Sequence, residues 1–365
     1  MVAFAWYLLP RGLEYAAAGA SFGAGPGAVA GLLVLLYFYW KYRADFQQKM
    51  DNQPAMIQES GASIITRMVR LALPVSLANI MLPVVSNIDL LIVPPRLEVA
   101  GYTVEQATEL FGYLTGMAVP LVNMATILTA SLAASLVPSV SEANTLGDRA
   151  AIFDRTATAI RIANLITIPA FVGMWLLATP ISQMLYATPN AGVSIAISSL
   201  GIFLLGIHQV TTGVLQGLGR TAIPVVNMVI SAGVKVVLGW TLTAMPQWGI
   251  KGAAWASNAD FGVAALLNMF FIYRYVGFAM DMRDTLKTAL AAAVMGLAAL
   301  GSYELLFAKG VGNTLSTLTG VMVGGGIYAV ALLLLGSIGE RELLKLPVVG
   351  RPVAAALKKI HLLRR

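Results

Sequence analysis

Apolar positions along the chain fall into long stretches that are separated by shorter polar segments. A helix needs about 20 consecutive apolar residues to cross about 30 Å of hydrocarbon, so this pattern predicts membrane-spanning helices. Nine stretches reach that length, and residues 1–9, which are apolar but too short to span, are expected to be the end of an earlier helix. The nine stretches cover residues 13–39, 71–94, 110–137, 159–183, 193–217, 222–245, 250–273, 286–307 and 313–336.

The composition agrees with this pattern. Hydrophobic residues make up 58% of the 365 positions and charged residues only 11%, against roughly 25% charged residues in an average soluble domain. The balance excludes a soluble enzyme, a disordered chain and a nucleic-acid-binding domain. With no cysteine and two histidines, the chain has no disulfide framework, thiolate nucleophile or multi-histidine metal site, and we expect no cofactor.

Basic residues predict how the chain is oriented in the membrane. Nineteen of the 24 Lys and Arg lie in alternate connections or beside them, and only four lie in the connections of the opposite side. Because lysine and arginine accumulate in cytoplasmic loops, these connections and the C-terminus are predicted to be cytoplasmic in a bacterial plasma membrane. The basic segments are residues 40–70, 138–158 with the next helix entry, 218–221, 274–287 and 337–365.

Three charged residues lie deep inside the predicted spans, more than four residues from either end: Asp89, Lys235 and Asp260. Burying a charge in a membrane costs at least about 2.5–3.5 kcal/mol, so such residues usually face a partner or a watery cavity. Lys235 and Asp260 lie at similar depths on consecutive antiparallel spans, and we predict that they form an ion pair near the midplane. Two roles stay open, stabilising the bundle or lining a cavity.

Other polar residues complete the candidate site. Arg96 follows Asp89 just past a pair of prolines, and together they are a candidate polar gate or anion-binding group. The alternative for Arg96 is an interfacial side chain that extends to water. Asn123 and Asn258 place amides within apolar spans and are candidate cavity residues.

One motif imitates a nucleotide site. Residues 217–222 read GLGRTA and match GxGxxG/A, but a dinucleotide site needs a preceding strand and a βαβ unit. Membrane helices are predicted on both sides here, so we interpret the motif as a cytoplasmic helix–helix turn.

The residues from 71 onward resemble a known family. They read LALPVSLANIMLPVVSNIDLLIVPPRLEVAGYT and, from 111, FGYLTGMAVPLVNMATILTASLAASLVPSVSEA. Later stretches read TTGVLQGLGRTAIPV at 211–225, VKVVLGW at 234–240 and GIKGAAWAS at 249–257. This sequence resembles the stage V sporulation protein B family of polysaccharide-biosynthesis flippases in the multidrug/oligosaccharidyl-lipid/polysaccharide (MOP) exporter superfamily, which is related to the lipid II flippases and, more distantly, to MATE drug antiporters.

The resemblance implies an all-α membrane protein with fourteen helices, of which this chain would supply helices 6 to 14 and lack most of the N-terminal lobe. Five segments follow from it. They are an N-terminal-lobe remnant at 1–39, a cytoplasmic linker at 40–70, a C-terminal six-helix lobe at 71–275, an additional helix pair at 286–336, and a basic cytoplasmic tail at 337–365.

The resemblance also implies a non-enzymatic flippase that moves a lipid-linked sugar pyrophosphate across the bilayer by alternating access, in cell-wall, polysaccharide or sporulation-related synthesis. Basic and amide groups, Arg96, Asn123, Lys235 and Asn258, would face the anionic headgroup. Asp89 and Asp260 would hold the basic groups or couple to H⁺ or Na⁺. The alternatives are a MATE-like cation-coupled drug antiporter, a membrane enzyme of envelope synthesis, and a chain that is inert or acts only with a separately encoded N-terminal half.

Overall fold

A computed structural model describes residues 2–22, 24–51 and 60–336 of the chain. The predicted tail at 337–365 lies outside these residues. The chain divides into two units, residues 1–69 and 70–365. All regular elements described are helical, so the predicted all-α class is confirmed.

The first unit contains three helices and the beginning of a fourth. They are α1 (Val2–Leu8), α2 (Leu13–Phe22), α3 (Ala24–Asp51) and α4, which runs from Gly61 to Val99 and continues into the second unit. Within this unit α1 packs against α2, and the Phe4 and Phe22 rings meet edge to face with centroids 5.7 Å apart. The stretch predicted as one span at 13–39 is therefore described as two helices that flank residue 23.

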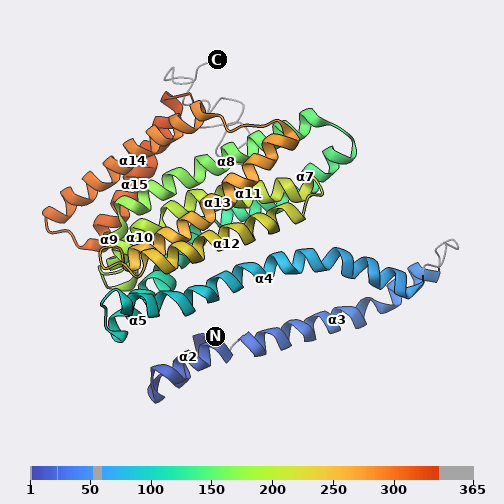
Figure 1. Cartoon of the computed structure of the whole chain (residues 1–365), viewed down its shortest axis with the longest axis horizontal. Coiled ribbons are helices and arrows are strands. Elements are labelled where there is room, and N and C mark those ends of the chain that lie inside the picture. The colour runs from blue at the N-terminus through green and yellow to red at the C-terminus, as the bar shows by residue number, and fades with distance from the viewer. Residues whose placement is uncertain (1, 23, 52–59, 337–365) are drawn as a thin grey trace. The chain divides into compact units, whose positions relative to one another are not determined.

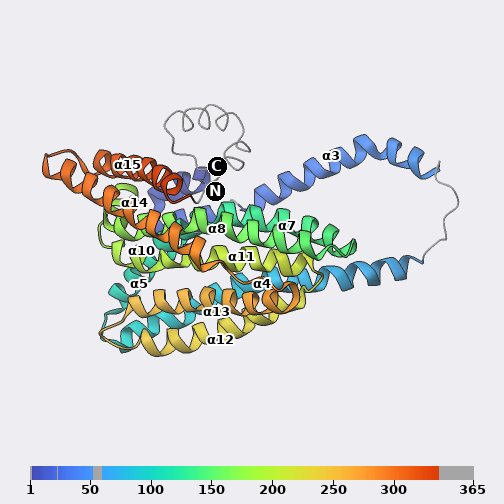
Figure 2. The same cartoon turned by 90° about the horizontal axis from the view of Figure 1, so that it is seen from above.

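The second unit is a bundle of packed helices (Figures 1 and 2). In chain order after α4 it contains α5 (Val104–Gly112), a π-helix (Tyr113–Ala118), α6 (Val119–Ala125), α7 (Ile127–Thr145), α8 (Arg149–Leu176), α9 (Ala178–Tyr186), α10 (Gly192–Ser198), α11 (Leu200–Gly217), α12 (Ala222–Leu242), α13 (Ile250–Val276), α14 (Met282–Ala308) and α15 (Asn313–Leu334).

Helix α11 lies at the centre of this bundle, where it packs against α7, α8 and α13 (Figure 2). In the span formed by α10 and α11, 61% of its 18-residue apolar stretch is buried inside the bundle. The corresponding share is 22–33% in the other single spans. Glycines allow this close packing. A Cβ added at Gly213 would lie 2.6 Å from the Ala133 carbonyl oxygen of α7. Small residues at such crossings let helix backbones approach closely inside a membrane.

The span predicted at 110–137 is bent. The segment from α5 to α6 (Val104–Ala125) and helix α7 are together long and apolar enough to form one candidate span. The two parts meet at an angle of 48°. At the bend, Thr126 leaves helical geometry and its hydroxyl donates to the Val122 and Asn123 carbonyls. The π-helix before it ends next to Pro120, which has no backbone N–H to continue a regular helical ladder.

Six helices in the described residues are long and apolar enough to cross a membrane, or seven with the bent pair. The predicted count of nine is therefore not confirmed, because the stretches at 13–39 and 71–94 are not among these candidates. The connection predicted at 138–158 is mostly helical in the structure. Helix α7 continues to Thr145 and α8 begins at Arg149, which leaves only three residues between them.

Candidate functional site

An ion pair joins α4 to α12. The Lys235 ammonium Nζ lies 2.6 Å from Asp89 Oδ2, and the two side chains are 9% and 22% exposed. A pair this short and this well buried satisfies both charges, which is the condition under which charges are tolerated inside a membrane.

Asp260 of α13 completes the cluster. Its carboxylate Oδ1 accepts a hydrogen bond of 2.6 Å from the Ser231 hydroxyl. Ser231 precedes Lys235 by four residues, so both side chains lie on one face of α12. The predicted ion pair between Lys235 and Asp260 is therefore wrong. The lysine binds Asp89, because α4 brings a carboxylate to the same face of α12, while Asp260 is held by a hydroxyl one turn away. Asp89, Ser231, Lys235 and Asp260 form what we call the midspan cluster.

Arg96 reaches α12 near its C-terminal end. Its Nε donates to the Trp240 carbonyl oxygen at 2.9 Å, and its guanidinium lies over the Trp240 ring, 4.4 Å from the centroid. Carbonyls in the last turn of a helix have no partner within the helix, so a cation there is favourable. In this structure Arg96 is a helix–helix anchor, and its predicted role as a gate or anion-binding group stays a prediction.

The two predicted asparagines lie apart from this cluster. Asn258 is buried on α13 and donates to the Ile197 carbonyl of α10 at 2.7 Å. This contact holds α13 against α10 and occupies one of the two N–H donors of the Asn258 amide. Asn123 is exposed beside the bend of the α5–α7 span.

A buried amide network extends the midspan cluster beyond the candidate site residues that were predicted from the sequence. Asn227 Nδ2 donates to Asn268 Oδ1 at 2.8 Å, and Asn268 Nδ2 donates to the hydroxyls of Thr212 at 2.9 Å and Thr211 at 3.2 Å. The network joins α11, α12 and α13. Asn227, Ser231 and Lys235 recur every four residues, and that spacing in the sequence already places them on one face of a helix.

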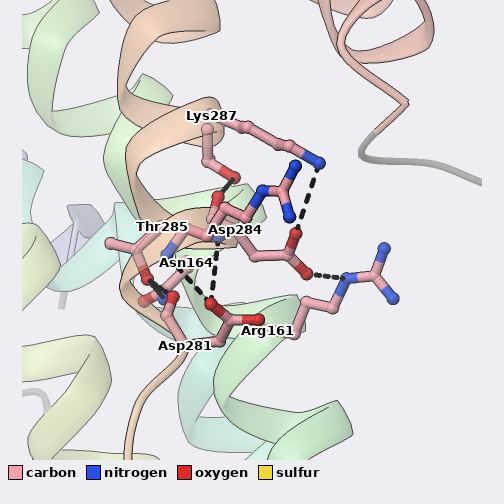
Figure 3. Close-up of polar contacts among 8 residues, drawn as sticks. Arg161, Asn164, Asp281, Asp284, Thr285 and Lys287 are labelled. Atoms are coloured by element: carbon pink, nitrogen blue, oxygen red, sulfur yellow. Dashed lines mark hydrogen bonds and ion pairs between the residues drawn. The ribbon is translucent and has the colours of Figure 1, made fainter.

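A second polar cluster lies where α8 meets the start of α14 (Figure 3). Asp284 Oδ2 lies 3.6 Å from Arg161 Nε, and Asp284 Oδ1 lies 3.8 Å from Lys287 Nζ. Asn164 Nδ2 donates to Thr285 Oγ1 at 3.2 Å, while Asn164 Oδ1 is buried and has no hydrogen-bond partner in the described structure. Arg161, Asn164, Asp284 and Thr285 line a cavity of about 230 Å³. The sequence pattern did not predict this cluster, because Asp284, Thr285 and Lys287 belong to the segment 274–287, which was interpreted as a cytoplasmic connection.

The described part of the chain contains no group of three or more His, Cys, Asp or Glu side chains that could hold a metal ion. The arrangement can hold opposite charges in a dry environment and can exchange hydrogen bonds between neighbouring helices.

Comparison with known proteins identifies relatives of this chain. It is 25% identical to stage V sporulation protein B of Bacillus subtilis (strain 168) over 348 residues, which cover 94% of this chain and 65% of that protein. It is 26% identical to lipid II flippase MurJ of the same organism over 296 residues, which cover 79% of this chain and 54% of that protein. The chain thus spans less than two thirds of the length of these relatives.

The fold is similar to a solved structure described as lipid II flippase MurJ in an inward closed conformation. The TM-score is 0.56 at 16% sequence identity, and the match covers 75% of this chain and 55% of that one. Together with the apolar helices, these relatives make this a multi-pass membrane protein. The family model for lipid II flippase MurJ matches residues 3–323, and the chain therefore belongs to the MurJ lipid II flippase family.

Proposed function

We propose that this chain works in a membrane flippase that carries a lipid-linked sugar pyrophosphate, a lipid II-like precursor, across the bilayer by alternating access. The family match over residues 3–323 is the observation that carries this proposal. It favours a flippase over a drug antiporter or an envelope enzyme. The C-terminus lies in the cytoplasm in this proposal, as the distribution of basic residues suggests.

The midspan cluster supplies the charges that such a cycle needs. A carrier must bind its substrate differently in its two states, and only a differential interaction shifts the equilibrium between them. A pyrophosphate competes with Asp89 for the Lys235 ammonium, so its arrival weakens the contact between α4 and α12. Release of the substrate on the other side lets the 2.6 Å ion pair form again.

Asp260 is the group we assign to ion coupling. Lys235 already neutralises Asp89, whereas Asp260 has a hydroxyl as its hydrogen-bond partner. A proton or a sodium ion on Asp260 would neutralise the remaining carboxylate of the cluster. If H⁺ is the coupling ion, the transport rate should depend on the pH gradient, and if Na⁺ is the coupling ion, it should depend on the sodium gradient. Either dependence should vanish in Asp260→Asn.

The test is a reconstituted transport assay. The purified chain is placed in vesicles that carry a lipid-linked sugar pyrophosphate with a fluorescent headgroup, and a membrane-impermeant reductant destroys the label in the outer leaflet. A flippase makes the inner-leaflet label accessible, and we expect Lys235→Met to slow this loss at least tenfold. Arg283→Gln is the matched control, because it removes one exposed positive charge of α14 far along the chain from the cluster.

The outcome separates two forms of the proposal. Activity of the chain alone supports a complete carrier, and activity only when the N-terminal half of a family member is added supports a two-part carrier. Absence of transport in both preparations would overturn the proposed function, provided that circular dichroism and cooperative thermal unfolding show the reconstituted chain to be folded.

A further inference from the structure

Three segments that are far apart in the sequence converge on a pocket at one end of the second unit. The pocket has a volume of about 640 Å³. It is formed by the junction between α7 and α8, the turn between α11 and α12, and the last turn of α13. Its lining consists of Asn144, Arg149, Ile152, Leu218, Gly219, Arg220, Tyr273, Arg274, Tyr275, Val276 and Gly277.

The pocket is strongly cationic. Arg149, Arg220 and Arg274 each come from a different one of these segments, and no Asp or Glu is among the described lining residues. The Arg220 guanidinium lies over the Tyr275 ring, 5.0 Å from its centroid. The ring holds this arginine beside the other two without neutralising it.

Nearby carboxylates are engaged elsewhere. Asp148 directly precedes Arg149, but its Oδ1 accepts a hydrogen bond of 2.9 Å from the Ala151 N–H and so caps α8. Glu142 lies 3.4 Å from Arg155, which is outside the pocket. The described ion pairs therefore leave the three pocket arginines without an acidic partner.

The backbone of the pocket is built by two left-handed turns. Gly219, at φ +74°, follows the end of α11 and directly precedes Arg220, and Gly277, at φ +75°, ends α13 two residues after Tyr275. A residue with a side chain is strained at such angles, so glycine fixes where these helices stop. The turn that imitates a nucleotide motif thus contributes an arginine to the pocket.

We propose that this pocket binds the phosphate group of an anionic membrane-lipid headgroup. Three guanidiniums held in one concave site repel one another, and a phosphate relieves that repulsion while it accepts paired N–H donors. The tyrosines offer additional hydroxyl donors to the phosphate or to the glycerol of a headgroup. Basic pockets between membrane helices at the cytoplasmic side are a recognised setting for such headgroups. The proposal requires only a membrane protein and does not depend on the flippase activity.

The test counts lipids bound to the purified full chain in an uncharged detergent by native mass spectrometry. Short-chain phosphatidylglycerol is titrated against phosphatidylcholine with the same acyl chains. We expect saturable binding of phosphatidylglycerol, little binding of phosphatidylcholine, and at least tenfold weaker phosphatidylglycerol binding in the double variant Arg220→Gln, Arg274→Gln. The control Arg283→Gln removes an exposed arginine outside the pocket and should bind like the wild type.

Further arms identify the source of the phosphate. Competition by undecaprenyl pyrophosphate at concentrations below those of phosphatidylglycerol would assign the site to the lipid-linked substrate class, and weaker competition would assign it to bulk anionic lipid. Competition by inorganic phosphate at equal concentration would overturn the lipid assignment.

The conservative variant Arg220→Lys guards against a folding defect. It keeps the positive charge but loses the planar fork that binds phosphate through two hydrogen bonds, so we expect partial weakening with unchanged thermal unfolding. Equal phosphatidylglycerol binding by the wild type and the double variant would refute the site, as would equal losses in the double variant and in Arg283→Gln.

Discussion

The close contact between α11 and α7 permits a stability prediction with a worked magnitude. In Gly213→Ala the new Cβ would lie 2.6 Å from the Ala133 carbonyl oxygen and 3.1 Å from the Ala133 carbonyl carbon and Cα. Ordinary van der Waals contact begins at 3.4 Å, so the two backbones must separate by about 0.8 Å at that point. The obstacle is main chain, which cannot move aside by changing a rotamer.

Two opposing effects set the size of the change. Overpacking a close contact costs about 1–3 kcal/mol. Replacing glycine by alanine inside a helix returns about 1 kcal/mol, because alanine loses less backbone freedom on folding. We therefore expect Gly213→Ala to be destabilised by up to about 2 kcal/mol.

The matched control is Gly233→Ala on α12. A Cβ at that exposed position meets nothing within 4 Å, so only the helical gain remains and stability should stay equal or rise. The free energies of unfolding of the two variants should then differ by about 1–3 kcal/mol. Far-UV circular dichroism in mixed micelles with increasing sodium dodecyl sulfate measures that difference. Equal unfolding midpoints for the two variants would refute the argument that glycine is required at this crossing.

Two further predictions concern polar contacts between helices. Asn268→Leu should lower the free energy of unfolding by about 1–3 kcal/mol, because it leaves the buried Asn227 amide N–H without its acceptor and removes the hydrogen bond to the half-buried Thr212. The double variant Asn227→Leu, Asn268→Leu should lose less stability than the sum of the two single changes, and strict additivity in the same denaturation assay would contradict the network. Arg96→Lys should lower the free energy of unfolding by about 0.5–1 kcal/mol, because an ammonium stacks less well than a guanidinium on the Trp240 ring. The quenching of tryptophan fluorescence should change in the same variant. A lysine variant as stable as the wild type would mean that this contact needs only a positive charge.

Much of the C-terminal bundle follows from apolar length alone. The predicted stretches at 193–217, 222–245 and 313–336 lie within about three residues of helices that the structure describes. Hydrocarbon thickness imposes that length regardless of which neighbour a helix has. The bend at Thr126 could not be predicted in this way, because the pattern at 110–137 stays apolar through the bend.

The candidate site was predicted only in part, for a different reason. The charges Asp89, Lys235 and Asp260 stand out from an apolar background, and the structure brings all three into one region. Their pairing depends on a contact 146 positions apart in the chain, and equal depth on consecutive helices gives no information about a third helix. Asn258 shows that a polar residue that stands out in the sequence need not belong to the site. Its amide is prominent in the sequence, yet it serves the carbonyl of Ile197.

The two contacts that α4 makes with α12 have a mechanical consequence. Asp89 and Arg96 are seven residues apart, so the contacts to Lys235 and to the Trp240 carbonyl are separated by about 10 Å along α4. A helix held at a single point can swivel about it. A helix held at two points along its axis cannot swivel until one contact breaks, and it cannot separate until both contacts break. Loss of one contact would therefore leave α4 tethered to α12 by the other, and α4 can leave α12 only when the Asp89–Lys235 and Arg96–Trp240 contacts are both broken.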